Sequence, residues 1–173
     1  MPVPVIIVPY NPRWPEFYKQ EKEKVVKVMG EKVKSIEHIG SSSVPGLGGK
    51  DIVDFAVGVQ SRETADESVD LLQALDYTSI TPQPGHTQWF YCLGKSPGLL
   101  PRYHLHLMKC PSPFWTKHIL FRYYLRKHPE VALEYFNLKK RLAEKYGRDR
   151  IGYTEAKTIF IERVMNKERK DLL

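Results

Sequence analysis

Hydrophobic and polar residues recur along this chain with two different periods, and the periods predict the order of its elements. Apolar residues at 14 to 29 are spaced three or four apart, which is typical of an amphipathic helix. Residues 33 to 39 alternate, as a strand with one buried face does. Residues 52 to 59 are apolar almost throughout and predict a strand buried on both faces. A second helix is expected to begin at Ser61.

The second half of the chain begins with strands and ends in helices. Alternation predicts strands at 87 to 93 and 102 to 109, joined by a Gly- and Pro-containing hairpin loop, with a short strand at 77 to 81 before them. Three helices follow, and their starts and stops are indicated by serine, proline and glycine. They are predicted at 112 to 128, 129 to 146 and about 153 to 168.

This order of elements predicts an α+β fold, with a small mixed sheet and flanking helices over residues 1 to 110. The C-terminal helical set, 111 to 173, is expected to pack on that sheet within a single domain, 1 to 173. A content of 42% hydrophobic and 27% charged residues fits a globular protein. The apolar opening is broken by prolines and resembles neither a signal peptide nor a membrane span, so a cytoplasmic protein without a membrane partner is expected.

The charge favours an anionic partner. The chain has 27 basic and 20 acidic residues, for a formal net charge of +7. Such a balance suits nucleic acid, a nucleotide or a phosphorylated metabolite. Acidic residues are interspersed among the basic ones in the C-terminal third, so the expectation of nucleic-acid binding rests on net charge alone.

The segment GSSSVPGLGGKD, between the first two predicted strands, carries the candidate chemistry. A glycine-serine turn offers backbone N–H groups and hydroxyls to a phosphate. A P-loop is excluded because Asp51 follows Gly49 and Lys50, where that motif requires Ser or Thr. A serine-hydrolase nucleophile elbow is excluded because Val44 stands where its second glycine belongs. Asp54, a carboxylate inside an apolar strand, suggests a metal ligand.

Four segments together resemble the GrpB family: EHIGSSSVPGLGGKDIVDFAVGV, RYHLHLM, FRYYLRKHPEVALEY and YTEAKTIFI. The resemblance covers nearly the whole chain. It implies a nucleotidyltransferase-like fold of the polymerase β type, in which a glycine-serine turn binds a nucleoside triphosphate and carboxylates on the next strand hold Mg²⁺. Some members of the family are fused to a dephospho-CoA kinase domain.

On that resemblance, Gly40, Ser41, Ser42 and Ser43 are the phosphate-binding residues and Asp54 is the metal ligand. The chain departs from the pattern of two acids spaced two apart, because Ala56 stands in the second position. Further metal donors would come from Glu37 or His38 on the preceding strand, or from His104 and His106. Alternation places the last two on one side of their strand, and imidazole pairs favour Zn²⁺ or Mn²⁺ over Mg²⁺. As neutral rings they are alternatively catalytic bases, or structural histidines.

Several basic residues are candidates for holding the anion. Arg122 and Arg126 lie one helical turn apart, which suits a two-sided grip on a phosphate or a pairing with nearby Glu on an exposed face. The full set of cations is Lys50, Arg102, Arg122, Arg126 and Lys157.

The leading hypothesis is a nucleotidyltransferase-like protein that binds a nucleotide or a phosphorylated small molecule together with Mg²⁺ or Mn²⁺, with Zn²⁺ as the alternative. A catalytically inactive binding module of the same fold is the second hypothesis, because Ala56 leaves Asp54 without a second acid. A metal-dependent hydrolase or phosphotransferase built on Asp54, His104 and His106 is the third. RNA binding is the fourth.

Overall fold

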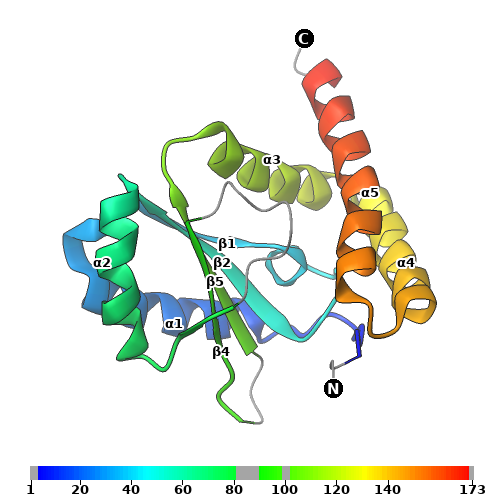
Figure 1. The fold of residues 1–173 in the computed structure, drawn as a ribbon. Helices are drawn as coiled ribbons and strands as arrows, with labels where there is room; N and C mark the ends of the chain where they lie inside the picture. Colours follow the sequence, from blue (N-terminus) through cyan, green and yellow to red (C-terminus); the bar gives the residue numbers. More distant parts are fainter. Residues whose placement is uncertain (1–3, 81–89, 99–101, 172–173) are drawn as a thin grey trace.

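A computed structural model describes residues 4–80, 90–98 and 102–171 and has the predicted α+β architecture (Figure 1). Five strands form one sheet in the order β1-β2-β5-β4-β3. The pair β2 and β5 is parallel and the other neighbours are antiparallel, so the sheet is mixed as expected. The strands are β1 (Ser35–Ile39), β2 (Ile52–Val59), β3 (Thr78–Ser79), β4 (Tyr91–Lys95) and β5 (Arg102–Lys109).

The helices begin and end close to their predicted positions. They are α1 (Trp14–Met29), α2 (Arg62–Gln73), α3 (Pro113–Lys127), α4 (Pro129–Tyr146) and α5 (Arg150–Asp171), with short 3-10 turns η1 (Gly30–Lys32) and η2 (Ser41–Ser43). Helix α5 extends beyond the predicted 153 to 168 at both ends. The strand predicted at 87 to 93 corresponds to β4, and its first three residues lie outside the described part of the chain.

One face of the sheet forms the main core, because every second residue of the central strands points toward α1 and α2. Phe55 and Val57 of β2 are fully buried there, as are Leu105 and Leu107 of β5. Trp14 of α1 belongs to the same cluster. Figure 1 shows α1 and α2 on this side of the sheet and α3 on the other.

The second face is the more polar one. Asp54 lies opposite His104 and Ala56 lies opposite His106 in the parallel ladder, so all four side chains emerge on this face. Helix α3 covers part of it through Trp115, which packs on a small apolar cluster with Ala56. Helices α4 and α5 pack against each other beside this face (Figure 1).

Local signals fix where the C-terminal helices begin and end. Ser112 caps α3, because its Oγ accepts a hydrogen bond from the Trp115 N–H at 3.1 Å, and Pro113 takes the first helical position. Helix α4 ends at Gly147, whose φ of 55° is one that glycine adopts at little cost. None of the helices in the described ranges is long and apolar enough to cross a membrane.

The N-terminal segment joins the helical set to the loop that precedes β2. The Val5 N–H donates to the Gly147 carbonyl at 3.0 Å, at the end of α4. Val8 and Gly49 exchange two main-chain hydrogen bonds of 2.7 and 3.0 Å, which form an isolated antiparallel bridge. One short extended segment thereby contacts both the sheet side and the helical side of the molecule.

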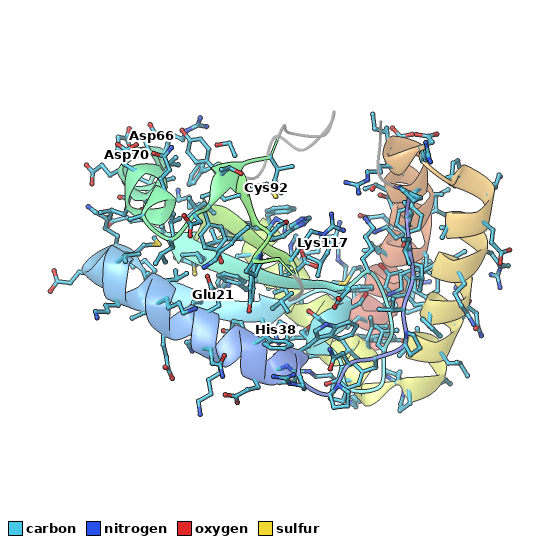
Figure 2. All side chains as sticks on the ribbon, turned by 90° about the horizontal axis from the view of Figure 1, so that it is seen from below. Glu21, His38, Asp66, Asp70, Cys92 and Lys117 are labelled. Carbon is cyan, nitrogen blue, oxygen red and sulfur yellow. The ribbon has the colours of Figure 1, made fainter. Side chains whose placement is uncertain are left out.

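A buried carboxylate links α1 to the edge of the sheet. Glu21 is 1% exposed and accepts hydrogen bonds from the Tyr77 hydroxyl at 3.0 Å and from Lys95 Nζ at 2.8 Å. Burial and the nearby Glu21 charge raise the pKa of Tyr77 well above its usual value. Figure 2 shows Glu21 beside α1. The buried charge is stable because the Tyr77 hydroxyl, Lys95 and, at 3.3 Å, Lys24 of the same helix compensate it together.

Removing the cation from this buried pair should be far more costly than removing one from a surface pair. Lys95→Met leaves Glu21 buried without its main partner and is expected to lower the free energy of unfolding by about 3 kcal/mol. The matched control is Lys32→Met, because Lys32 pairs with Glu67 on the surface, at 2.5 Å and with both side chains at least 35% exposed. Lys32→Met should lower the free energy of unfolding by about 1 kcal/mol or less. Urea unfolding measures both, and equal losses would contradict the assigned role of Glu21.

Candidate functional site

The loop after β1 passes directly over Asp54. Gly40 has a φ of 70°, and a Cβ added there would lie 3.1 Å from Asp54 Oδ2, so a glycine is required by both conformation and space. The three serines that follow form the single 3-10 turn η2. The predicted glycine-serine turn is therefore present, and it covers the Asp54 carboxylate near the N-terminal end of β2.

The three serines of this turn have different roles. Ser42 Oγ lies 2.9 Å from His38 Nε2 and is hydrogen-bonded to it, while the Ser43 hydroxyl donates to the Gly40 carbonyl at 2.5 Å. Both are buried and shape the turn. Ser41 instead accepts a hydrogen bond from Lys139 Nζ at 2.6 Å. Of the predicted phosphate-binding serines, the structure brings Ser41 to the basic side chains described below.

The two predicted arginines hold the protein's own main chain. Arg122 Nη1 donates to Glu37 Oε2 at 2.6 Å and to the His38 carbonyl at 2.7 Å. Arg126 donates from Nε and Nη2 to the Ser43 carbonyl at 2.9 and 2.7 Å. These four hydrogen bonds tie α3 to β1 and η2. In this structure the two arginines anchor the turn, and their predicted grip on a phosphate stays a prediction.

Asp54 and the two histidines form a hydrogen-bonded group. His106 Nε2 donates to Asp54 Oδ1 at 3.1 Å, and His104 Nδ1 lies 3.7 Å from the same oxygen. Burial opposes the charge of Asp54, but His106, His104 and Lys50 outweigh it and lower its pKa. Burial likewise opposes the charged His106 ring, yet its bonds with Asp54 and Cys92 raise the pKa of His106 to about 10. Burial lowers the pKa of His104 to about 4.

These residues do not fit the predicted divalent ion as they are arranged here. Both imidazoles are directed at one oxygen of Asp54, and a protonated His106 has no lone pair for a metal. Glu37 is paired with Arg122. Within residues 4–80, 90–98 and 102–171, no group of three or more His, Cys, Asp or Glu is placed to hold a metal ion. The metal stays a prediction.

His38, the other predicted metal donor, lies on the opposite face of the sheet. Its ring stacks on Tyr18 of α1 with centroids 4.6 Å apart, and Figure 2 shows it beside that helix. Burial lowers the pKa of His38 to about 4, so the ring is neutral at physiological pH. Of the alternative donors on β1, His38 does not face Asp54, because the alternation of β1 turns it toward the main core.

Three lysines from distant parts of the chain lie around the Asp54 side of the loop, and we call them the lysine cluster: Lys50, Lys139 and Lys157. Lys139 of α4 is 2% exposed and donates to Ser41 Oγ and, at 2.5 Å, to the Gly48 carbonyl. Lys50 and Lys157 both lie over the Tyr153 ring, with Nζ 5.0 and 4.7 Å from its centroid. The ring supports two cations at once.

The lysine cluster has an excess of positive charge. Burial and the Lys50 ammonium lower the pKa of Lys157 to about 7, and burial with Lys157 and Lys50 holds the pKa of Lys139 well below its usual range. The pKa of Lys50 is lowered by burial too, and Arg150 and Arg102 add to the effect. None of the ion pairs within the described ranges includes a lysine of the cluster, and Asp54 is the acid that opposes these shifts.

The sequence predicted Lys50, Lys157 and Arg102 but missed Lys139. A signal for Lys139 was present, since it falls within the apolar stripe of α4, between Tyr135 and Leu142. A lysine on the buried face of an amphipathic helix needs a polar partner. Its partner could not be identified without the fold, because Ser41 is 98 residues away.

Comparison with known proteins places this architecture among its relatives. A family model described as "GrpB protein" matches residues 4–167. The chain is similar to "Glutamate-rich protein GrpB" of Alkalihalophilus pseudofirmus, at 33% identity over 94% of this chain and 95% of that protein. It is 34% identical to "UPF0157 protein YqkA" of Bacillus subtilis over 82% of this chain and 40% of that one. A crystal structure of "conserved protein GrpB" from Enterococcus faecalis superposes with a TM-score of 0.81, at 31% identity, and covers 96% and 99% of the two chains.

The neutral state of His38 predicts a specific sensitivity to acid. The ordinary pKa of 6.5 applies in the unfolded chain and about 4 applies in the folded one, so the unfolded state binds more protons between these values. Stability therefore falls as the pH falls from 6.5 to 4, by roughly 3 kcal/mol for this residue. His38→Gln should flatten the fall of unfolding free energy over that range. His104 and His118, whose pKa values burial also lowers to about 4, contribute equally to the loss of stability in the parent and in the His38→Gln variant. Parallel pH profiles would show that His38 is not buried as a neutral ring.

Proposed function

The chain belongs to the GrpB family, and we propose that it binds an anionic small molecule, a nucleotide or another phosphorylated compound, at the lysine cluster. The observation that carries this proposal is the excess of cations around a buried lysine. Lys139 is held by a hydroxyl and a carbonyl, and Lys50 and Lys157 lie close enough to lower its pKa. The three lysines repel one another, and each disfavours the charged form of its neighbours. A bound anion offsets this repulsion and so stabilises the folded protein.

The surroundings of the cluster suit a phosphate. Ammonium groups act as point charges for phosphate oxygens. Gly49 lets the loop approach closely, since a Cβ there would lie 3.0 Å from Lys139 Nζ and from the Ser41 side chain. Arg102 begins β5 on the same face as Asp54 and adds positive charge at the rim of the cluster. The buried position of Lys139 favours a compact anion over a nucleic-acid backbone.

Binding without metal-assisted transfer is the reading that the geometry favours. Ala56 leaves no second carboxylate on β2, and the Asp54 oxygen that a metal would need already accepts a hydrogen bond from His106. Metal-dependent nucleotidyl transfer, expected from the family resemblance, is the second candidate. The metal-dependent hydrolase or phosphotransferase predicted from the same residues has the same requirement. The two classes make opposite predictions for Asp54, as set out below.

Thermal melting against pyrophosphate and ATP tests the site directly. With a chelator present, both anions should raise the melting temperature, because they bind the folded state. Lys157→Met and Lys139→Met should weaken binding about tenfold or more, the loss expected for a hydrogen bond to a charged group. Lys167→Met is the matched control, because Lys167 is exposed on the same helix as Lys157, and it should bind as the parent does.

Asp54→Asn separates the two candidate functions in the same assay. If the site binds anions without metal, loss of this opposing charge leaves or strengthens the shift. If Mg²⁺, Mn²⁺ or Zn²⁺ is required, the shift appears only with metal and vanishes in the variant. An absence of any shift with either anion, with or without metal, would contradict both proposals.

Anion binding should take up protons near neutral pH. Burial and Lys50 lower the pKa of Lys157 to about 7 in the free protein, and a bound anion raises it. Affinity should therefore decline as the pH rises above 7, by as much as tenfold per unit until the pKa of the complex is reached. Calorimetry in buffers of different ionisation enthalpy counts the protons. Lys157→Arg, which keeps the charge, should abolish the Lys157 contribution to the uptake, and the same uptake in parent and variant would overturn this assignment.

A further inference from the structure

A pocket of about 330 Å³ lies where the loop after β1 meets helices α3 and α4. Residues 45 to 47 of the loop line it, together with Leu125 and Arg126 near the end of α3 and one stripe of α4 between Pro129 and Phe136. A volume of this size lies within the range of small-molecule sites. The pocket is distinct from the lysine cluster, because none of its lining residues belongs to that cluster.

The walls of this pocket are apolar, apart from one arginine. Every lining residue other than Arg126 is a proline, glycine, alanine, leucine or phenylalanine. Leu47 and Leu125 are 2% exposed and belong to the core cluster beneath, against which Phe136 also packs. Leu133 is 60% exposed and extends this apolar surface to the solvent. A ligand for the pocket therefore needs an apolar body.

Arg126 has donors that the fold does not use. A guanidinium carries five N–H donors in one plane. Nε and Nη2 both donate to the Ser43 carbonyl, at 2.9 and 2.7 Å, so that carbonyl occupies one edge of the group. Among the described residues, Nη1 has no acceptor and Arg126 has no carboxylate partner. Nη1 and the second hydrogen of Nη2 form a free edge, which matches the two oxygens of a carboxylate.

The positive charge of Arg126 is not neutralised by its surroundings. Partial burial and the neighbouring Arg122 charge lower the pKa of Arg126. Glu37, an acid that opposes this shift, is itself bound by Arg122 at 2.6 Å. The acids in the same turns of α4 are already bonded, Glu130 to His128 and Glu134 to Arg163. An anion in the pocket would complement this charge.

We propose that this pocket binds a small organic acid, a monocarboxylate with an aliphatic or aromatic body, and that Arg126 holds its carboxylate. The apolar body would lie against Leu125, Leu133 and Phe136 and remove their surfaces from water. One cation matches the single charge of a carboxylate. A phosphate group carries nearly two charges and three acceptor oxygens, and the three lysines of the cluster suit it better. The pocket does not depend on the anion site proposed above.

Straight-chain carboxylates test this assignment in an NMR titration of the ¹⁵N-labelled protein. Hexanoate and octanoate should shift the amide signals of Gly46 and Leu133 most. Affinity should rise about fourfold for each added methylene until the pocket is full. Octan-1-ol has the same apolar body without the charge and should bind at least about tenfold more weakly. Lys157→Met, which is directed at the lysine cluster, should bind octanoate as the parent does, so the two sites are tested separately.

Two variants locate the ligand. Arg126→Gln should lower the affinity for octanoate to that for octan-1-ol, and its melting curve shows whether the turn is kept. Leu133→Glu avoids the contact with Ser43 and places a negative charge at the rim, so it should weaken octanoate binding about tenfold. Ile159→Glu is the matched control, because Ile159 is 77% exposed on α5, and it should bind as the parent does.

Three results would overturn the assignment. Octanoate and octan-1-ol could bind the parent equally, which would show that Arg126 does not recognise the charge. Octanoate could bind Leu133→Glu as tightly as the parent, which would place it elsewhere. Sedimentation could show a dimer that Leu133→Glu dissociates, in which case the pocket is a contact with a second copy of the chain.

Discussion

The hydrogen bonds of Lys139 are the constraint on which the arrangement of the candidate site depends. A fully buried ammonium is tolerated only where its hydrogens find acceptors, and Ser41 Oγ and the Gly48 carbonyl provide them. Both acceptors belong to the loop between β1 and β2, while the lysine belongs to α4. The position of the helical set is thus coupled to the conformation of the loop. Arg122 and Arg126 of α3 strengthen the coupling by holding β1 and the Ser43 carbonyl.

Position 56 is where this chain departs from the pattern of two acids that the family resemblance implies. The loop passes over the strand, with Gly40 packed against Asp54. Where the second acid would stand there is Ala56, which packs under Trp115 of α3 in an apolar cluster. Its neighbour on β5 is His106, which is bonded to Asp54. The Asp54 carboxylate is therefore paired with a histidine of the neighbouring strand.

Much of the fold could be predicted from periodicity, since β2, β5, α1 and α3 begin and end where the hydrophobic pattern and the capping residues indicate. The site could be predicted only in part. Asp54 and His106 were expected to be near each other because a resemblance supplied the fold. The hydroxyls of Ser42 and Ser43 were not predicted to point inward, because a local sequence does not show which atoms a tight turn must satisfy. The pairing of Cys92 with His106 depends on strand order and register, which pattern alone leaves open.

The N-terminal segment bonds at one end to Gly147 and at its other end to Gly49. During synthesis it leaves the ribosome before its partner at the end of α4, which is made more than a hundred residues later. At about 5 to 20 residues per second the segment waits for seconds with its main-chain groups bonded to water. The segment therefore docks late in the synthesis of the chain. The loop that carries Ser41 and Gly48 is secured only when that docking and the burial of Lys139 are complete, so the candidate site cannot form before α4 has been made.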